Sequence, residues 1–238
     1  MVINYSKISK QYSSGFSLQI EKLEFKTGEI IGLVGNNGAG KTTLLKLSVD
    51  LISPNSGTIK IDKIKINESE FWKEHLGVFI STEFLIPFLR PLEYFYFIGK
   101  LFNYTEKQVD SILSRYDNFI KDEVLNQGGK LIRNFSNGNQ VKIGIIAAMM
   151  FNPSILLLDE PFTGLDPTSQ VILKQKLIEF AKAKSKLIII SSHDLHHITD
   201  VCSRIILLED GKIISDKKTD SATLHELENY FKVRGEFD

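Results

Sequence analysis

Apolar and polar residues alternate along the first part of the chain. The alternation runs through residues 1–34, with turn signals at 13–15 and 26–29, and it leads into the continuous apolar run 30–34. A second alternating stretch covers residues 58–66, after a turn rich in Ser, Pro, Asn and Gly. Alternation of this kind is typical of half-buried strands. The pattern therefore predicts an antiparallel β layer next to one buried strand.

Short continuous apolar runs return later, at residues 76–80, 155–158 and 187–190. Between the last two, Leu173, Leu177 and Phe180 fall on one face of an amphipathic helix. Buried strands that alternate with helices indicate a parallel sheet covered on both faces. The stretch 205–215 is expected to form a closing hairpin, and a short helix is expected over 222–231.

The segment 82–152 has a helical character. Pro91 suits the first position of a helix, Thr105 and Gln108 form a capping box, and Ser136 is a candidate cap for a helix that ends before Pro153. In the stretch 84–97, apolar residues occupy positions all round the expected helix. Neighbouring helices cover them, or some remain exposed as an interaction patch.

Composition and charge narrow the class of protein. The 238 residues fit one or two domains, and the 29 basic and 29 acidic residues cancel, which argues against a nucleic-acid partner. Cys202 is the single cysteine, so a disulfide framework is excluded and a reducing compartment is expected. The N-terminus lacks the layout of a signal peptide, and no apolar run is long enough to span a bilayer. We expect a chain that is soluble by itself.

The stretch after residue 34 carries a phosphate-binding motif. The pattern Gly35-x-x-x-x-Gly40-Lys41-Thr42 is a P-loop, in which glycines allow backbone N–H groups to surround an anion. Lys41 is expected to reach the β- and γ-phosphates, and the Thr42 hydroxyl to coordinate Mg²⁺. The residues expected to bind the nucleotide here are Gly35, Asn36, Asn37, Gly38, Ala39, Gly40, Lys41, Thr42 and Thr43.

Polar residues at two predicted strand ends complete this chemistry. Asp159 ends the run 155–158 and is expected to hold Mg²⁺, directly or through water, and Glu160 to polarise the attacking water. His193 follows the other run and would lie at the same sheet edge, near the γ-phosphate. The alternatives are two acids facing solvent and a structural histidine. Tyr12 is either a structural aromatic residue or a ring that stacks on the base.

Taken together, these residues resemble the nucleotide-binding domain of ATP-binding cassette (ABC) transporters over nearly the whole chain. Residues 135–139 stand where the family has its signature, 163–166 match the D-loop, His193 matches the switch histidine, and Tyr12 the adenine-stacking aromatic. The resemblance implies an α/β P-loop NTPase with a RecA-like core, an antiparallel β layer and a helical subdomain. The chain would be a single ABC ATPase domain, with core and β layer at about 1–81 and 153–220, helical subdomain at about 82–152, and a tail at about 221–238.

The chain departs from the family pattern in two motifs. The signature keeps Ser136 and Gly138, which in the family reach the γ-phosphate of the partner's ATP, but has Asn137 and Asn139 in place of glycine and glutamine. Ser81 replaces a glutamine, and Glu83 is a candidate to supply the missing oxygen to Mg²⁺ or water. Such changes are similar to those of the exporter-type branch.

The resemblance also implies a mechanism. Two cassettes, identical or different, would close head to tail around two ATP molecules with Mg²⁺, and hydrolysis would open them. The membrane helices would belong to a separate transmembrane permease subunit, and the chain would be peripheral at the cytoplasmic face of the cell membrane. The alternative is a soluble ABC-type ATPase that is not coupled to transport.

Overall fold

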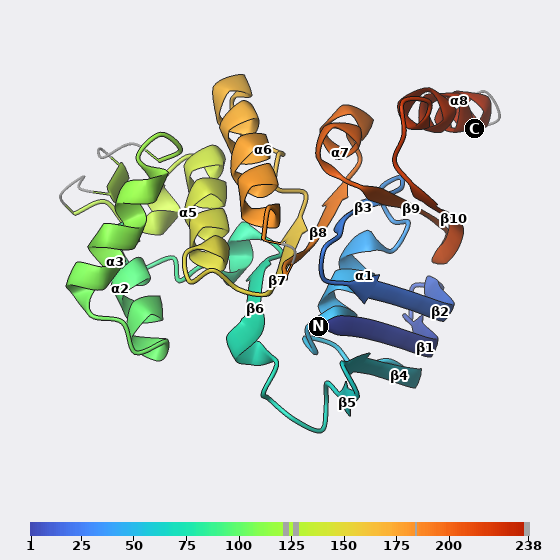
Figure 1. Ribbon diagram of the computed structural model, residues 1–238, viewed down its shortest axis with the longest axis horizontal. Coiled ribbons are helices and arrows are strands. Elements are labelled where there is room, and N and C mark those ends of the chain that lie inside the picture. The colour runs from blue at the N-terminus through green and yellow to red at the C-terminus, as the bar shows by residue number, and fades with distance from the viewer. Residues whose placement is uncertain (121–123, 126–128, 184, 236–238) are drawn as a thin grey trace.

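The computed structural model describes residues 1–120, 124–125, 129–183 and 185–235 of the chain, and Figure 1 shows their arrangement. These residues form a four-stranded sheet in the order β2-β1-β4-β5 and a six-stranded sheet in the order β10-β9-β3-β8-β7-β6. A group of helices lies beside the β6 edge of the larger sheet (Figure 1). The α/β architecture predicted from the sequence is confirmed.

The smaller sheet is antiparallel, as its alternating residues predict. It consists of β1 (Val2–Gln11), β2 (Ser17–Lys26), β4 (Ser56–Ile61) and β5 (Ile64–Lys65). Its inner face buries alternate side chains, among them Ile3, Tyr5 and Phe25. These side chains pack in one core cluster with the buried residues of α1 (Lys41–Ser48), which lies between the two sheets.

The larger sheet is mainly parallel. Its parallel strands are β3 (Ile30–Val34), β6 (Leu76–Phe79), β7 (Ile155–Asp159), β8 (Leu187–Ser192) and β9 (Arg204–Glu209). The predicted hairpin adds β10 (Lys212–Lys218), antiparallel to β9. Leu156 and Leu158 face one core cluster and Ile155 and Leu157 the other, because successive side chains of a strand point to opposite faces. This explains why the strand is a continuous apolar run.

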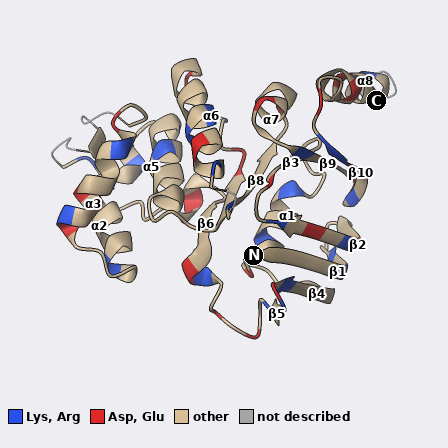
Figure 2. Ribbon diagram, in the orientation of Figure 1, with Lys and Arg blue, Asp and Glu red and all other residues tan. Residues whose placement is uncertain are grey.

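Helices cover the other face of this sheet. They are α6 (Pro167–Ala181), α7 (Leu195–Val201) and α8 (Thr223–Gly235), and they lie in a row across the top of Figure 1. Basic and acidic positions are interspersed over the sheets and helices of the described chain (Figure 2). No helix in the part of the chain described here has both the length and the apolar character that crossing a membrane requires.

The helical subdomain contains α2 (Pro91–Leu101), α3 (Glu106–Leu113) and α5 (Asn137–Met149). Pro91 takes the first position of α2, Thr105 and Gln108 form a capping box, and the Ser136 hydroxyl accepts the Asn139 N–H at the start of α5. Short 3₁₀ turns connect the elements, at Lys73–His75, Thr82–Phe84, Ser114–Tyr116 and Ile132–Asn134.

Two glycines let β6 and α5 approach closely. A Cβ atom on Gly77 would lie 1.9 Å from the Ala148 carbonyl oxygen, and one on Gly144 would lie 2.4 Å from the Phe79 ring. Real Cβ atoms do not come this near to other heavy atoms, so a side chain at either position would push strand and helix apart. The helical subdomain is therefore seated directly on the edge strand of the core.

Candidate nucleotide-binding site

The P-loop joins the end of β3 to the start of α1. Gly38 has a φ of 85° and Gly40 a φ of 106°, a left-handed region that side chains disfavour. Gly40 is also the N-cap residue of α1 and makes no side-chain cap, so the first N–H groups of the helix keep their capacity to bind an anion. The glycines of the motif are thus explained by the backbone that a phosphate cradle needs.

Lys41 is buried at the centre of this loop. Its Nζ donates to the carbonyl oxygen of Gly35 at 2.6 Å and to that of Asn36 at 3.4 Å. The same Nζ lies 3.5 Å from Oε1 of Glu160. The ammonium group is therefore held between the P-loop and the carboxylate that follows β7.

Asp159 lies at the end of β7, next to the P-loop threonine. Thr42 Oγ1 donates to Asp159 Oδ2 at 2.5 Å, and Ser191 Oγ donates to Asp159 Oδ1. Burial raises the pKa of the Asp159 carboxyl group, and the two hydroxyl donors act in the opposite direction. The chain thus brings together a carboxylate and a hydroxyl, the hard oxygen ligands that suit Mg²⁺.

Glu160 follows in a left-handed backbone conformation, with a φ of 47°. Its Oε2 lies 2.9 Å from His193 Nδ1 and accepts the backbone N–H of His193 at 3.4 Å. Its Oε1 is buried without a hydrogen bond and faces Lys41. The predicted neighbours Lys41, Glu160 and His193 are therefore adjacent, with one carboxylate oxygen left over for a further donor.

A cavity of about 370 Å³ opens over the P-loop. Its volume is within the range of small-molecule sites. The lining residues come from the β1–β2 turn, the P-loop and the end of β7: Tyr12, Ser14, Phe16, Asn36, Asn37, Gly38, Ala39, Gly40, Lys41, Thr42, Thr43 and Glu160. Tyr12 lines this cavity together with the P-loop residues, and its stacking on a base stays a prediction. The ring centroids of Tyr12 and Phe16 are 6.1 Å apart.

Three polar or aromatic residues of this region were missed in the sequence. Ser14 and Phe16 line the cavity, and Ser191 binds Asp159. Ser14 and Phe16 are only a few positions from Tyr12, so the turn between the two predicted strands was the available signal. Ser191 gave no signal, because it is one more residue of a buried strand.

Other predicted site residues lie elsewhere. Glu83 is exposed in the 3₁₀ turn after β6, and it is not among the residues that line the P-loop cavity. Ser136 and Gly138 begin α5 and are also outside that cavity. A Cβ atom on Gly138 would lie 2.5 Å from the carbonyl oxygen of Gly164, so the signature segment packs directly on the loop 163–166.

Comparison with known proteins identifies the family of this chain. The family model for ABC transporters matches residues 18–163. The chain belongs to the ABC transporter family. Among its relatives, the ABC transporter ATP-binding protein NatA of Bacillus subtilis is 31% identical over 83% of this chain and 78% of its own. The phosphonates import ATP-binding protein PhnC of Treponema denticola is 30% identical over 93% of this chain and 91% of its own.

Solved ABC cassettes have the same fold. The dimeric bacterial cassette MJ0796 is 25% identical with a TM-score of 0.80, covering 92% of this chain and 99% of that one. A dimeric post-hydrolysis state of the same cassette, bound to ADP and Pi, is 26% identical with a TM-score of 0.79. The present chain is an ATP-binding subunit that hydrolyses ATP and powers transport through separate transmembrane subunits. Relatives include importers, so the exporter-type interpretation stays a prediction.

Proposed function

We propose that this subunit hydrolyses ATP with Mg²⁺ at the site of Lys41, Asp159 and Glu160, as one half of a head-to-tail dimer at the cytoplasmic face of a membrane. The observation that carries the proposal is the convergence of three groups. Lys41 Nζ lies 3.5 Å from Glu160 Oε1, and Thr42 Oγ1 donates to Asp159 Oδ2 at 2.5 Å. A cation, an anion-binding loop and a carboxylate base thus share one cavity edge.

The oxygen donors fit Mg²⁺. The described part of the chain has no cluster of three or more His, Cys, Asp or Glu able to hold a metal. Mg²⁺ is usually bound by one or two carboxylates together with phosphates and water, so Asp159 and Thr42 suffice for the protein's share. When bound, the ion would neutralise charge on the phosphates. The chain's own contribution is to hold the carboxylate and the hydroxyl side by side.

Glu160 is the proposed base and His193 the residue that orients it. Oε1 of Glu160 is buried, lies 3.5 Å from Lys41 Nζ and accepts no hydrogen bond, so its lone pairs remain for the proton of a water molecule held beside the phosphates, and Oε2 is fixed by the His193 ring at 2.9 Å. A carboxylate with one fixed and one available oxygen is suited to take a proton from the attacking water. Lys41 supplies the positive charge beside the phosphates.

Ser136 and Gly138 are proposed to serve the second subunit. Both begin α5, outside the cavity of their own P-loop. The Ser136 hydroxyl accepts the Asn139 N–H at 3.4 Å, which uses a lone pair of the oxygen and leaves the hydroxyl proton for an external acceptor. We propose that the start of α5 contacts the γ-phosphate of the ATP bound by the second subunit, whether that subunit is identical or different. Both sites belong to one ABC domain, whose helical subdomain covers about residues 82–152.

Tyr12 offers a direct test of how the nucleotide lies. Stacking on a base contributes about 1–3 kcal/mol, so we expect Tyr12→Ala to weaken ATP binding by about 5- to 150-fold. Tyr12→Phe should bind like wild type, because the ring remains. Titration calorimetry with inorganic triphosphate, which has no base, is the control and should not distinguish the two variants. Equal ATP affinity for Tyr12→Ala and Tyr12→Phe would remove the stacking role.

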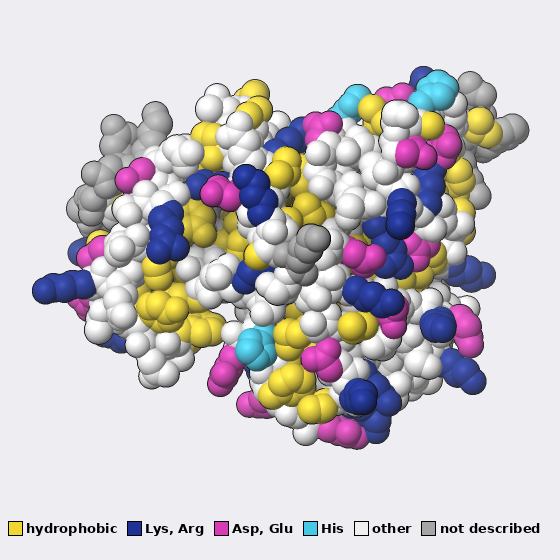
Figure 3. Space-filling view, in the orientation of Figure 1, with side chains coloured by type: hydrophobic (Ala, Val, Ile, Leu, Met, Phe, Trp, Pro, Cys, Tyr) yellow, Lys and Arg dark blue, Asp and Glu magenta, His cyan; other side chains and the backbone are white. Residues whose placement is uncertain are grey.

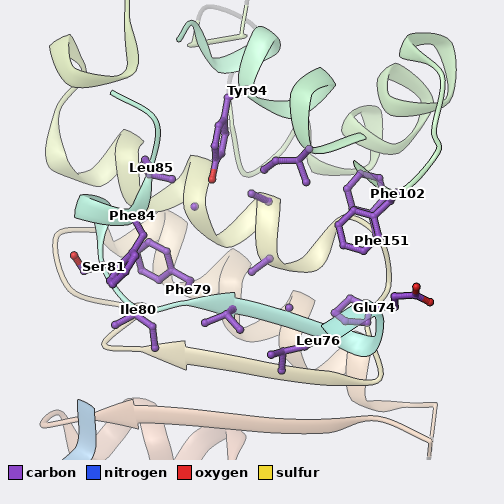
Figure 4. A pocket seen from close by; sticks show the side chains of 17 residues that line it. Glu74, Leu76, Phe79, Ile80, Ser81, Phe84, Leu85, Tyr94, Phe102 and Phe151 are labelled. Atoms are coloured by element: carbon purple, nitrogen blue, oxygen red, sulfur yellow. The ribbon is translucent and has the colours of Figure 1, made fainter. Parts of the chain in front are cut away.

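A second groove is the proposed docking site for the transmembrane subunit. It lies between β6, α2 and α5 and is lined mainly by aromatic and aliphatic residues, with Glu74 and Ser81 as polar members (Figure 4). In Figure 4, Phe79 and Phe84 lie at one end, and Phe102 and Phe151 are stacked at the other, with ring centroids 4.8 Å apart. Figure 3 shows hydrophobic side chains gathered on the helical part next to the sheets. Because the subunits of this family act on transmembrane partners, the occupant we propose is a short apolar helix of that partner.

Phe84 and Phe88 make a matched pair for testing this groove. Phe84 lines the groove and is 54% exposed, whereas Phe88 is 65% exposed, carries the Arg133 guanidinium over its ring and is not part of the groove lining. We expect Phe84→Ser to reduce co-purification with the co-produced transmembrane subunit by about 10-fold, in line with the loss of one apolar anchor. Phe88→Ser should change it little, and both should keep normal ATP binding. If Phe84→Ser still co-purifies like wild type, the docking site lies elsewhere.

A further inference from the structure

Ser191 contacts both acidic residues of the site through one oxygen atom. It is fully buried in β8, and the parallel register places it opposite Asp159 in β7. Its Oγ donates to Asp159 Oδ1 and lies 2.9 Å from the backbone nitrogen of Glu160. The hydroxyl group therefore contacts the side chain of one acidic residue and the backbone of the next.

The direction of these hydrogen bonds follows from the groups involved. A backbone N–H can only donate, so Ser191 Oγ accepts from Glu160. The hydroxyl has a single proton, and this proton is directed to Asp159. Thr42 supplies the corresponding donor on the other side, at Oδ2. The Asp159 carboxylate is thus fixed in its plane by one hydroxyl on each oxygen.

The hydrogen bond from the Glu160 N–H to Ser191 holds a backbone conformation that is rare for this residue type. Glu160 has a φ of 47°, a left-handed conformation that residues other than glycine seldom adopt. Its N–H is shared between the Oγ and the carbonyl oxygen of Ser191, the latter at 3.2 Å. Both acceptors belong to one residue of the neighbouring strand, so Ser191 holds the backbone that aims the Glu160 side chain at Lys41 and His193.

We propose that Ser191 is a positioning residue for ATP hydrolysis, which sets the Asp159 carboxylate toward Mg²⁺ and the Glu160 carboxylate toward the attacking water at the same time. The inference rests on the roles given above to Asp159 and Glu160. It adds that these two roles share one support, and that removing a single buried oxygen atom weakens both.

The test compares Ser191→Ala, Ser191→Thr and Ser48→Ala. Ser48 is the matched control, because it is also buried and its hydroxyl also hydrogen bonds, to Tyr5 and to the Leu44 carbonyl oxygen. Binding of a fluorescent ATP analogue is measured in EDTA and across a Mg²⁺ titration, and steady-state hydrolysis gives kcat and KM. Thermal unfolding reports the stability of each variant.

We expect Ser191→Ala to bind the analogue normally in EDTA but to need about 10-fold more Mg²⁺ for half-maximal effect, the usual loss when a residue behind a metal ligand is removed. At saturating Mg²⁺, kcat should still be about 10-fold low with KM for ATP unchanged, because Glu160 is less well aimed. Ser48→Ala should show wild-type Mg²⁺ dependence and wild-type kcat, even if its thermal stability is lower. Ser191→Thr, which keeps the hydroxyl, should restore both properties.

Wild-type Mg²⁺ dependence and kcat in Ser191→Ala would overturn the inference. The proposed site itself is checked separately by Asp159→Asn, which should lose most of the Mg²⁺ effect on binding. If Asp159→Asn keeps that effect, the assignment of Asp159 fails and the role of Ser191 fails with it. Should the extra methyl of threonine prevent folding, the comparison of Ser191→Ala with Ser48→Ala still decides.

Discussion

Replacement of Glu160 by glutamine is expected to lower kcat for ATP hydrolysis by about 10²- to 10⁴-fold while ATP binding is kept. The amide has nearly the same shape as the carboxylate and can still contact His193, which lies 2.9 Å from Oε2. It has no basic oxygen for the proton of the attacking water. Because the resemblance to the family implies that hydrolysis opens the two closed cassettes, the variant should accumulate as a dimer with ATP and Mg²⁺.

Light scattering coupled to size exclusion measures this accumulation. Glu68→Gln is a suitable control, because Glu68 is an exposed carboxylate that pairs with Lys65 at a surface turn. It should hydrolyse ATP and change its oligomeric state like wild type. A Glu160→Gln enzyme with full turnover would show that the base is another group.

Lys41→Ala should lose most of its affinity for ATP. Hydrogen bonds to charged groups contribute about 1.5–3 kcal/mol, which corresponds to about 10- to 100-fold weaker binding. The loss should be larger for ATP than for adenosine, because the ammonium group contacts phosphates. Calorimetric titration with both ligands separates the two effects.

The same helix provides the control. Lys46 lies in the last turn of α1, away from the P-loop, and Lys46→Ala removes the same charge from the same element. It should bind ATP like wild type, and circular dichroism should show both variants folded. Equal affinity in Lys41→Ala and wild type would contradict the P-loop assignment.

Features that depend on neighbouring residues could be predicted from the sequence. The P-loop is one contiguous stretch of sequence, and two of its glycines, Gly38 and Gly40, are required locally because the backbone has a positive φ at these positions. The caps at Thr105 and Ser136 are contacts across three residues. The parallel sheet follows from apolar runs that are buried on both faces. These features are predictable because the residues that local chemistry favours at these positions are also the ones that the complete fold requires.

Features that depend on register between distant segments could not be predicted. Ser191 and Glu160 are 31 positions apart, and only the alignment of β7 with β8 brings them together. Glu83 illustrates the same limit. Its nearness in sequence to Ser81 makes it a candidate metal ligand, but its N–H donates to the Ser81 hydroxyl in a tight turn, and its side chain is exposed. Nearness along the chain does not fix the direction of a side chain.

The close packing of β6 against α5 makes the strand and the helix one rigid unit. At Gly77 the strand lies directly against the Ala148 carbonyl oxygen, and at Gly144 the Phe79 ring packs directly against the helix backbone, so strand and helix have little room to shift past each other at these points. The groove that we propose for docking is lined by Ala147 and Ala148 near the C-terminal end of α5, and Ser136 caps the N-terminal end of the same helix. Thirteen residues of helix separate the two ends by about 20 Å. In the dimer we propose, a displacement of the transmembrane subunit in the groove is therefore expected to reach the ATP bound by the second cassette as a rigid-body movement of α5.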